Sequence, residues 1–453
     1  MKKTIIIFIT LLLGVLYNNC FAIEFDEMGK VDIHGFISQG YMKSNENNFL
    51  GKTEDGSFQF NEVGINFATD ITYQLRLGLQ IFSRDLGSLG NDELTIDWAF
   101  ADYRWEDFLG ARLGQMKLSH GLFNKTRDID AVRTCILLPQ SVYFETWRDI
   151  LTSIRGIGIY GNISPEYIGD FAYQIQTGIA GLQPESSVIG TLEENIPFGT
   201  KIDVNDINEK GVYDASLAWN SPLKGLKLNQ SYWYARFDTN STFLNSLIFP
   251  QGFELPMDFA LPFSVAGMPA GTIIPKGTML PFDVTLYNAG ADEKIKVKSK
   301  TYVTSVEYTW NNLVFISEYL LAEYYIKLGQ LPAKEFTALG YYGMLNYRFT
   351  DWFEAGCYYS EYYLDRSDKN SKKAIKEAES VGKKLHDYEH WMKDFCLTLR
   401  FDLTYSWTVK LEGHVFNGVE SSIDSENLDK NGDGYLDYEK NWFLFATKVS
   451  FNF

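Results

Sequence analysis

This chain divides into short segments whose connections alternate between very short and long, and that division leaves few folds open to it. Sixteen segments of about ten residues can be traced, and a tilted strand of that length crosses a bilayer. The segments start near Val31, Phe58, Tyr73, Leu94, Leu109, Ile154, Asp170, Val212, Leu226, Ser299, Leu313, Ala338, Trp352, Trp391, Trp407 and Trp442. We therefore expect a β protein made of consecutive hairpins.

The connections predict the kind of sheet. Most links after even-numbered segments are tight turns, as at Ile71, Asn311 and Thr350. The links after odd-numbered segments are mostly long, and they cover residues 44–56, 85–93, 121–153, 181–211, 239–297, 328–337, 367–389 and 421–440. An even strand number with short turns at one end and long loops at the other predicts an all-β fold, a transmembrane antiparallel up-and-down β-barrel of about 16 strands with short periplasmic turns and long extracellular loops.

Three residue patterns support a closed barrel. All 12 prolines fall in the proposed turns or loops, as expected where every strand is hydrogen-bonded on both sides. Phe395, Leu397 and Leu399 alternate with polar residues, so one face of that strand suits lipid. The tryptophans beside short turns fit an interfacial belt, and they are Trp105, Trp219, Trp310, Trp352 and Trp407.

The N-terminus reads as a secretory leader over residues 1–22, in which two lysines precede an apolar run that ends before Ala22. Residues 23–453 then form one barrel domain. Cys20 could instead be a lipoprotein cysteine, although the asparagines in front of it do not suit that processing. The net charge of -17 argues against nucleic acid as a partner. Three cysteines remain after cleavage, and because this number is odd, no disulfide framework is expected.

The last segment ends on an aromatic residue and carries Val449, Phe451 and Phe453 on one face. This looks like the carboxy-terminal signature of outer-membrane proteins that the barrel assembly machinery reads. Together with the sixteen segments and the long third loop, it makes the chain resemble the bacterial outer-membrane porins, a superfamily of 16-stranded Gram-negative channels that includes general and phosphate-selective members. The stretch over residues 113–143 looks like the fifth strand and third loop of such a porin.

The resemblance implies a water-filled channel in the outer membrane of a Gram-negative bacterium, usually a homotrimer, with a third loop that folds inward to form the constriction. It implies outer-membrane lipid and small hydrophilic solutes as partners, no required cofactor and no enzymatic activity. The charged residues of the third loop are Lys125, Arg127, Asp128, Asp130, Arg133, Glu145, Arg148 and Asp149. Charges at a constriction select ions, whereas in a solvated loop they would simply pair with one another.

Strand parity places eleven further charges on the lumen wall. They are Asp32, Glu62, Arg76, Arg348, Glu354, Asp394, Arg400, Asp402, Lys410, Glu412 and Lys448. Acidic and basic residues are nearly balanced in this set, so the acidic excess of the chain belongs mostly to the loops. That distribution suggests a vestibule that mildly favours cations. The wall lacks the basic ladder that a phosphate-specific channel would need.

The eighth loop resembles the first part of an EF-hand calcium loop. The oxygen donors Asp429, Asn431, Asp433 and Asp437 are correctly spaced, but Lys440 stands where a bidentate glutamate belongs. Weak Ca²⁺ binding and an ordinary Asp/Asn/Gly-rich loop both remain open.

Two other motifs favour structural interpretations. The glycines Gly156, Gly158 and Gly161 lie within a predicted strand. The HxxEH sequence that starts at His386 leads directly into another predicted strand. A short charged helix is predicted just before it, within residues 371–385.

The fifth loop, residues 239–297, is too apolar for a solvated loop, and it could fold over the mouth, enter the lumen or reach a neighbouring subunit.

The function that fits these observations is passive diffusion of small hydrophilic solutes and ions through a porin channel. A substrate-selective channel for a sugar or an organic acid is the alternative within the class. A loop-plugged outer-membrane receptor or adhesin barrel is the alternative from another class. A barrel enzyme fits less well, because the inward His34 and His414 have no accompanying GxSxG nucleophile motif.

Overall fold

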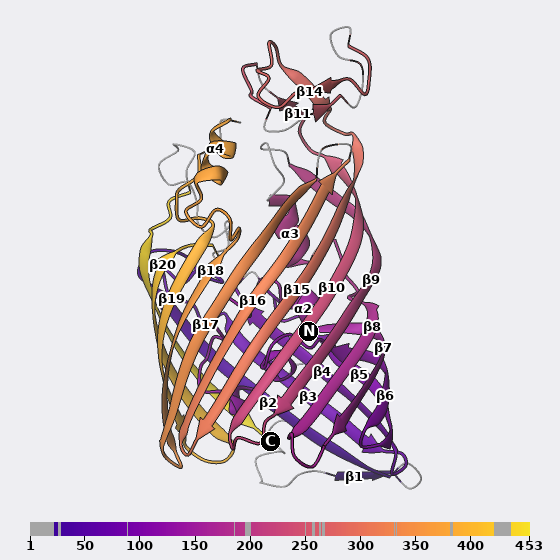
Figure 1. Ribbon diagram of the computed structural model, residues 1–453. Helices are drawn as coiled ribbons and strands as arrows, with labels where there is room; N and C mark the ends of the chain where they lie inside the picture. The colour runs from indigo at the N-terminus through magenta and orange to yellow at the C-terminus, as the bar shows by residue number, and fades with distance from the viewer. Residues whose placement is uncertain are drawn as a thin grey trace, which may run out of the picture.

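The computed structural model describes residues 22–25, 29–87, 89–184, 186–194, 201–249, 251–255, 259–261, 264, 268–329, 331, 333–380, 384–420 and 436–453. Residues 1–21 of the predicted leader lie outside this part of the chain. In the described part, sixteen long strands form one closed antiparallel barrel (Figure 1). The predicted fold class is therefore confirmed.

Each barrel strand pairs with its neighbours in sequence, and β21 closes the ring on β2 from Phe36↔Asn452 to Ser44↔Leu444. A short strand β1, Ala22–Phe25, pairs with the start of β2. The barrel strands are β2 (Gly29–Ser44), β3 (Phe60–Asp70), β4 (Leu75–Leu86), β5 (Thr95–Glu106), β6 (Leu109–Lys117), β7 (Ser153–Ile163), β8 (Asp170–Ile179), β9 (Ile202–Asn220), β10 (Leu226–Phe243), β15 (Asp292–Trp310), β16 (Leu313–Leu328), β17 (Lys334–Thr350), β18 (Phe353–Tyr363), β19 (Trp391–Asp402), β20 (Trp407–Gly418) and β21 (Asn441–Asn452).

The remaining elements lie in the loops. They are η1 (Asn124–Thr126), η2 (Asp130–Val132), α2 (Arg148–Leu151), α3 (Ser187–Glu194), β11 (Leu247–Phe249), β12 (Phe259–Ala260), β13 (Ile273–Ile274), β14 (Val284–Tyr287) and α4 (Lys372–Ser380). Helix α4 confirms the charged helix predicted in loop seven, and the three motif glycines lie in β7 as expected. Among the described residues, every helix is too short or too polar to cross a bilayer.

The outer face of the barrel is apolar and the inner face is polar. On β19, Phe395, Leu397 and Leu399 are 41%, 56% and 38% exposed, whereas Asp394 and Cys396 between them are buried. Four tryptophans beside the short turns are exposed, namely Trp105, Trp310, Trp352 and Trp407. The predicted direction of the apolar faces is therefore correct, and the exposed rings form a belt at the end of the barrel that carries the short turns.

Six strands run much further than the ten residues expected from bilayer thickness. They are β2, β9, β10, β15, β16 and β17, with 16, 19, 18, 19, 16 and 17 residues. The predicted loop bounds 181–211, 239–297 and 328–337 were wrong, because each of these loops includes residues that belong to a strand. The ladder continues above the apolar band, where Ile295 and Val297 are buried on the inner face.

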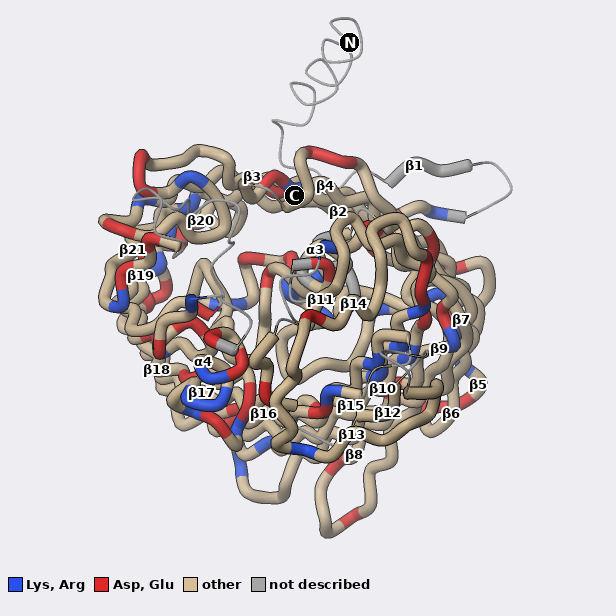
Figure 2. Tube along the Cα trace, turned by 90° about the horizontal axis from the view of Figure 1, so that it is seen from above, with Lys and Arg blue, Asp and Glu red and all other residues tan. Residues whose placement is uncertain are grey.

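Loop five folds on its own scaffold of two short hairpins, β11 with β14 and β12 with β13. The hairpin of β11 and β14 stands above the ends of β10 and β15 (Figure 1), and in the view from above it lies within the ring of strands (Figure 2). Its buried Phe249, Phe253 and Leu255 share one hydrophobic cluster with Val204 of β9 and Ile295 of β15. Of the three arrangements left open by the sequence, the described residues thus show the first, in which loop five folds at the mouth of the barrel.

Candidate functional site

Loop three, residues 118–152, lies inside the barrel and is attached to opposite walls. The backbone N–H of Ser119 donates to Asp214 on β9 at 3.1 Å, and that of Gly121 donates to the hydroxyl of Ser231 on β10 at 3.0 Å. Further along, the N–H of Leu137 donates to Glu412 on β20 at 2.9 Å. Strands β9 and β10 lie across the ring from β20 (Figure 2). Loop three therefore crosses the lumen, as the resemblance predicted.

The first group of loop-three charges surrounds Glu145. Its carboxylate is 2.7 Å from Arg127 of the same loop, 2.7 Å from Arg84 on β4 and 3.8 Å from Arg148. Arg148 also pairs with Glu62 on β3 at 3.2 Å. Burial alone would raise the pKa of Glu145, but the three guanidinium groups outweigh it and hold the pKa well below its ordinary value. The carboxylate is therefore ionised and acts as a fixed anchor.

The second group surrounds Asp130, which is 3% exposed. Lys448 on β21 and Arg133 each lie 2.8 Å from its carboxylate, and Lys410 on β20 lies 3.8 Å away. Lys448 also contacts Glu62, so the two groups are joined through β3. Burial would raise the pKa of Asp130, but the cations from the wall and the loop lower it far below its ordinary value.

The third group is smaller. Lys117, at the end of β6, contacts Asp128 of loop three and lies 2.9 Å from Asp97 on β5. Lys125 is the exposed charged residue among the described side chains of loop three, and its ammonium donates to Gln174 on β8 at 2.6 Å. The side chain of Asp149 lies outside the described residues.

The predicted constriction residues thus have different environments. Arg127, Asp128, Asp130, Arg133, Glu145 and Arg148 are all buried in ion pairs within loop three or with the wall. A charge that controls ions in water must be reached by water. The buried six therefore hold the loop in place, whereas Lys125 is exposed to the lumen.

The lumen-wall residues predicted by parity also form pairs. Arg348 lies 2.7 Å from Glu354 and 3.0 Å from Asp402, and Arg400 lies 2.9 Å from the same Asp402. Arg76 is half exposed and lies 3.9 Å from Asp70. Asp32 lies on the inward parity of β2, half-buried. Asp394 and Glu412 both contact His414.

Several anchoring residues were missed from the sequence. The carboxylate of Glu318 on β16 accepts the hydroxyl protons of Tyr143 and Tyr342 and the N–H of Leu122. Glu318 and Asp97 lie on strands whose alternation is too irregular to assign a face from sequence. The pattern that could have placed Glu318 is the position of Phe315 and Tyr319 on the same strand. Both are exposed and face outward, so Glu318, which has the opposite parity, faces inward.

Most of the EF-hand-like loop at residues 429–440 lies outside the described residues. Asp429, Asn431 and Asp433 lie outside the described residues, and Asp437 is half-buried. Calcium binding there stays a prediction.

A closed barrel of sixteen antiparallel strands, an apolar outer belt, a polar lumen and an inward third loop together define the fold of a bacterial outer-membrane porin. Neither a protein-family model nor a curated protein matches the sequence.

Solved structures do match this fold over nearly the whole chain. The outer membrane channel DcaP of Acinetobacter baumannii is 8% identical, with a TM-score of 0.53, covering 95% of this chain and 99% of that one. Outer-membrane expressed OmpT of Vibrio cholerae is 10% identical, with a TM-score of 0.51, covering 96% and 100%. OmpF of Salmonella typhi, solved with daunomycin, is 11% identical, with a TM-score of 0.50, covering 96% and 100%. At these identities the likeness establishes the fold.

Proposed function

We propose that this protein is an outer-membrane porin that lets small hydrophilic solutes and ions diffuse passively into a Gram-negative cell. The observation that carries the proposal is loop three, which is held inside a closed barrel by wall residues on both sides of the lumen. A peptide segment anchored in this way narrows the lumen at a constant height and so sets a size limit without moving. No covalent step is required.

The charges that a solute meets are the exposed ones. On the lumen side these include Lys125 of loop three. Arg112 of β6 is half-buried and lies 3.0 Å from Asp102 of β5. The chain as a whole carries a net charge of -17, so the electrostatic potential at the mouth favours cations. We propose a mild cation preference.

The test is conductance in a planar bilayer, recorded with the purified protein across a salt gradient. Discrete steps with a reversal potential on the cation side are expected. The Lys125→Glu variant should shift the reversal potential further toward cations, whereas Lys369→Glu, the same charge change on loop seven, should leave it close to wild type. A folded barrel that gives no steps would contradict the channel proposal.

The assembly and targeting of the protein form part of the same proposal. We propose cleavage of the leader near Ala22, assembly as a homotrimer with outer-membrane lipid, and recognition of the last strand by the barrel assembly machinery. Conductance steps in groups of three and a trimer mass in detergent are the expected results. Weak calcium binding at residues 429–440 is proposed as well, and recordings with and without calcium test it.

A second candidate function is a receptor or adhesin barrel that its own loops close. The observation that favours it is the burial of six loop-three charges, combined with a folded loop five at the mouth. In that case the wild type would be silent, and shortening loop five or detaching loop three would open it.

A further inference from the structure

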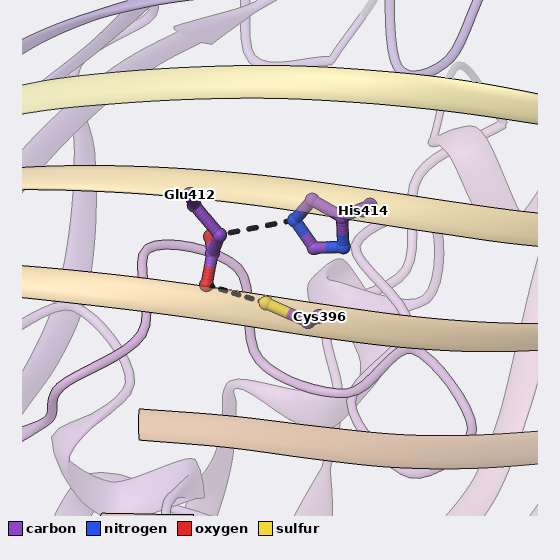
Figure 3. Close-up of side chains that lie close together, drawn as sticks. All are labelled: Cys396, Glu412 and His414. Atoms are coloured by element: carbon purple, nitrogen blue, oxygen red, sulfur yellow. Dashed lines mark hydrogen bonds and ion pairs between the residues drawn. The ribbon is translucent and has the colours of Figure 1, made fainter. Parts of the chain in front are cut away.

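Three donor side chains of different chemistry meet on the inner face of β19 and β20. Cys396 and His414 are directly opposite each other in the ladder, and Glu412 precedes His414 on the same face. Figure 3 shows the Glu412 carboxylate joined by a dashed line to each of the other two side chains. Its oxygens lie 3.2 Å from the Cys396 sulfur and 3.5 Å from Nε2 of His414. All three residues are at most 2% exposed.

The His414 ring is already oriented as a ligand. Its Nδ1 lies 3.1 Å from both oxygens of Asp394, and Asp394 also accepts the hydroxyl proton of Tyr358 at 2.9 Å. A carboxylate on one ring nitrogen is the usual support of a histidine that binds a metal through the other. The other nitrogen, Nε2, is buried, lies 3.5 Å from a Glu412 oxygen and makes no hydrogen bond within the described residues. An orphan nitrogen of this kind in a polar cluster needs an explanation.

The charges of the cluster also favour a cation. Asp394 and Glu412 are both buried, and within the described chain the His414 ring is the single cationic group within 4 Å of either carboxylate. Two carboxylates that share one imidazole in a low-dielectric site leave negative charge poorly compensated. A divalent ion bound by both Glu412 and Nε2 would replace the imidazolium as the counter-charge of Glu412 and would lie closer to that carboxylate.

We propose that Cys396, Glu412 and His414 bind one divalent transition-metal ion of the zinc class. A thiolate, an imidazole and a carboxylate form a donor set that suits zinc better than calcium or magnesium. The three donor atoms lie within 4.8 Å of one another. Zinc bonds at about 2.0–2.3 Å, so the donors need to close by roughly 1 Å around one ion.

Binding follows a simple balance. The S–H bond of Cys396 and the Nε2–H bond of the His414 imidazolium break, both protons pass to solvent, and a sulfur–metal bond and an Nε2–metal bond form. Glu412 continues to hold loop three to the wall, because the N–H groups of Ile136 and Leu137 in that loop donate to its oxygens. The ion would therefore strengthen the same wall position to which loop three is attached, and it would raise the stability of the folded protein.

The experiment uses the full mature protein, refolded from denaturant into detergent with Co²⁺ as the spectroscopic probe. One ion per chain is expected, with a thiolate-to-cobalt charge-transfer band in the near ultraviolet. The Cys396→Ser variant should lose that band, and its affinity should fall at least tenfold. Cys357→Ser is the matched control, because Cys357 lies on the adjacent β18 opposite the outward Leu397, and it should behave as wild type.

A second variant addresses the supporting carboxylate. Asp394→Asn should keep the band but weaken cobalt binding by about 10- to 100-fold, since the loss of such a partner typically has that effect. Folding of every variant is checked by heat-dependent gel mobility. The proposal is overturned if folded wild type binds no cobalt, if the bound cobalt lacks the thiolate band, or if Cys357→Ser removes the band. Cobalt in the acidic loop eight cannot produce this band, because residues 429–440 contain no sulfur.

Discussion

Glu318 on β16 and Tyr143 in loop three are joined by a hydrogen bond of 2.5 Å across a sequence separation of 175 residues. The same carboxylate accepts the hydroxyls of Ser305 and Tyr342 and the backbone N–H of Leu122. Four donors therefore converge on one buried acceptor group, which holds loop three to the β15–β17 wall.

Replacing Glu318 with alanine should leave these donors without an acceptor. Each unsatisfied buried donor costs about 1–3 kcal/mol, so a loss of several kcal/mol is expected. The midpoint of urea unfolding measures it. Glu323→Ala, on the outward face of the same strand, is the control and should change little. Equal losses for the two variants would show that Glu318 is not an anchor.

Glu145 should be needed to hold loop three inside the barrel. Glu145→Gln leaves Arg84, Arg127 and Arg148 without their shared counter-charge, and breaking a buried pair in this way costs about 3–5 kcal/mol. The folded-state pKa of Glu145 lies below its ordinary 4.5, so its contribution is present above pH 4.5 and is lost as the pH falls below that value. Single-channel recordings should show noisier and larger conductance for the variant at pH 7. Wild-type conductance that stays unchanged in strong acid would argue against this anchor.

His120 should make the stability of the barrel fall in mild acid. Its Nδ1 accepts the indole N–H of Trp233 at 3.1 Å, and its Nε2 lies 2.8 Å from the carbonyl oxygen of Val142, so the buried ring is neutral. Burial lowers the pKa of His120 from 6.5 to about 4. The stabilisation is therefore complete above pH 6.5 and is lost as the pH falls toward 4, by about 3 kcal/mol in total.

Urea unfolding at pH 7.5, 6 and 5 tests this dependence. The His120→Gln variant should be less stable at pH 7.5 but should lose less stability between pH 7.5 and 5 than wild type does. Parallel pH profiles for the two proteins would contradict the assignment. The comparison stays above the range in which most carboxylates titrate.

The exposed tryptophans should lie at the membrane interface. Trp310 is 61% exposed beside a short turn, whereas Trp442 is fully buried. Lipids brominated near the headgroup should quench Trp310, because an interfacial indole is in contact with the acyl-chain ends nearest the headgroups. Trp310→Phe should reduce the quenchable fluorescence, and Trp442→Phe should not. The opposite result would place the belt away from the lipid.

Phe453 should matter for assembly more than for stability. Its N–H and carbonyl pair with Gly35 of β2 at 3.0 Å each, and its ring lies where a Cβ on Gly35 would collide with it at 2.5 Å. Phe453→Ala keeps the backbone pair, so unfolding in detergent should change modestly. The amount of protein in the outer membrane should fall severalfold if the assembly machinery reads this ring. Asn452→Ala is the neighbouring control, and an equal loss for both would sink the interpretation.

The barrel itself could be predicted from local patterns. Turn spacing, proline positions and the alternation around Phe395 and Leu397 depend only on near neighbours along the chain, and they specify strand number and the lipid face. Strand length was harder to predict from the sequence, because the ladder of β10 and β15 continues well beyond the length that a bilayer requires. Nothing local marks where a strand leaves the membrane.

A closed barrel with an apolar exterior, and most of the charges inside it, could be predicted from the amino-acid sequence. The role of those charges depends on the folded arrangement of distant segments. Arg148 meets Glu62 across 86 residues, and Lys410 meets Asp130 across 280. Such pairs form because barrel closure and the inward path of loop three bring distant segments into buried contacts, where the dielectric is low and a charge without a partner is costly. Periodicity along the chain carries the direction of a side chain but not the identity of its partner.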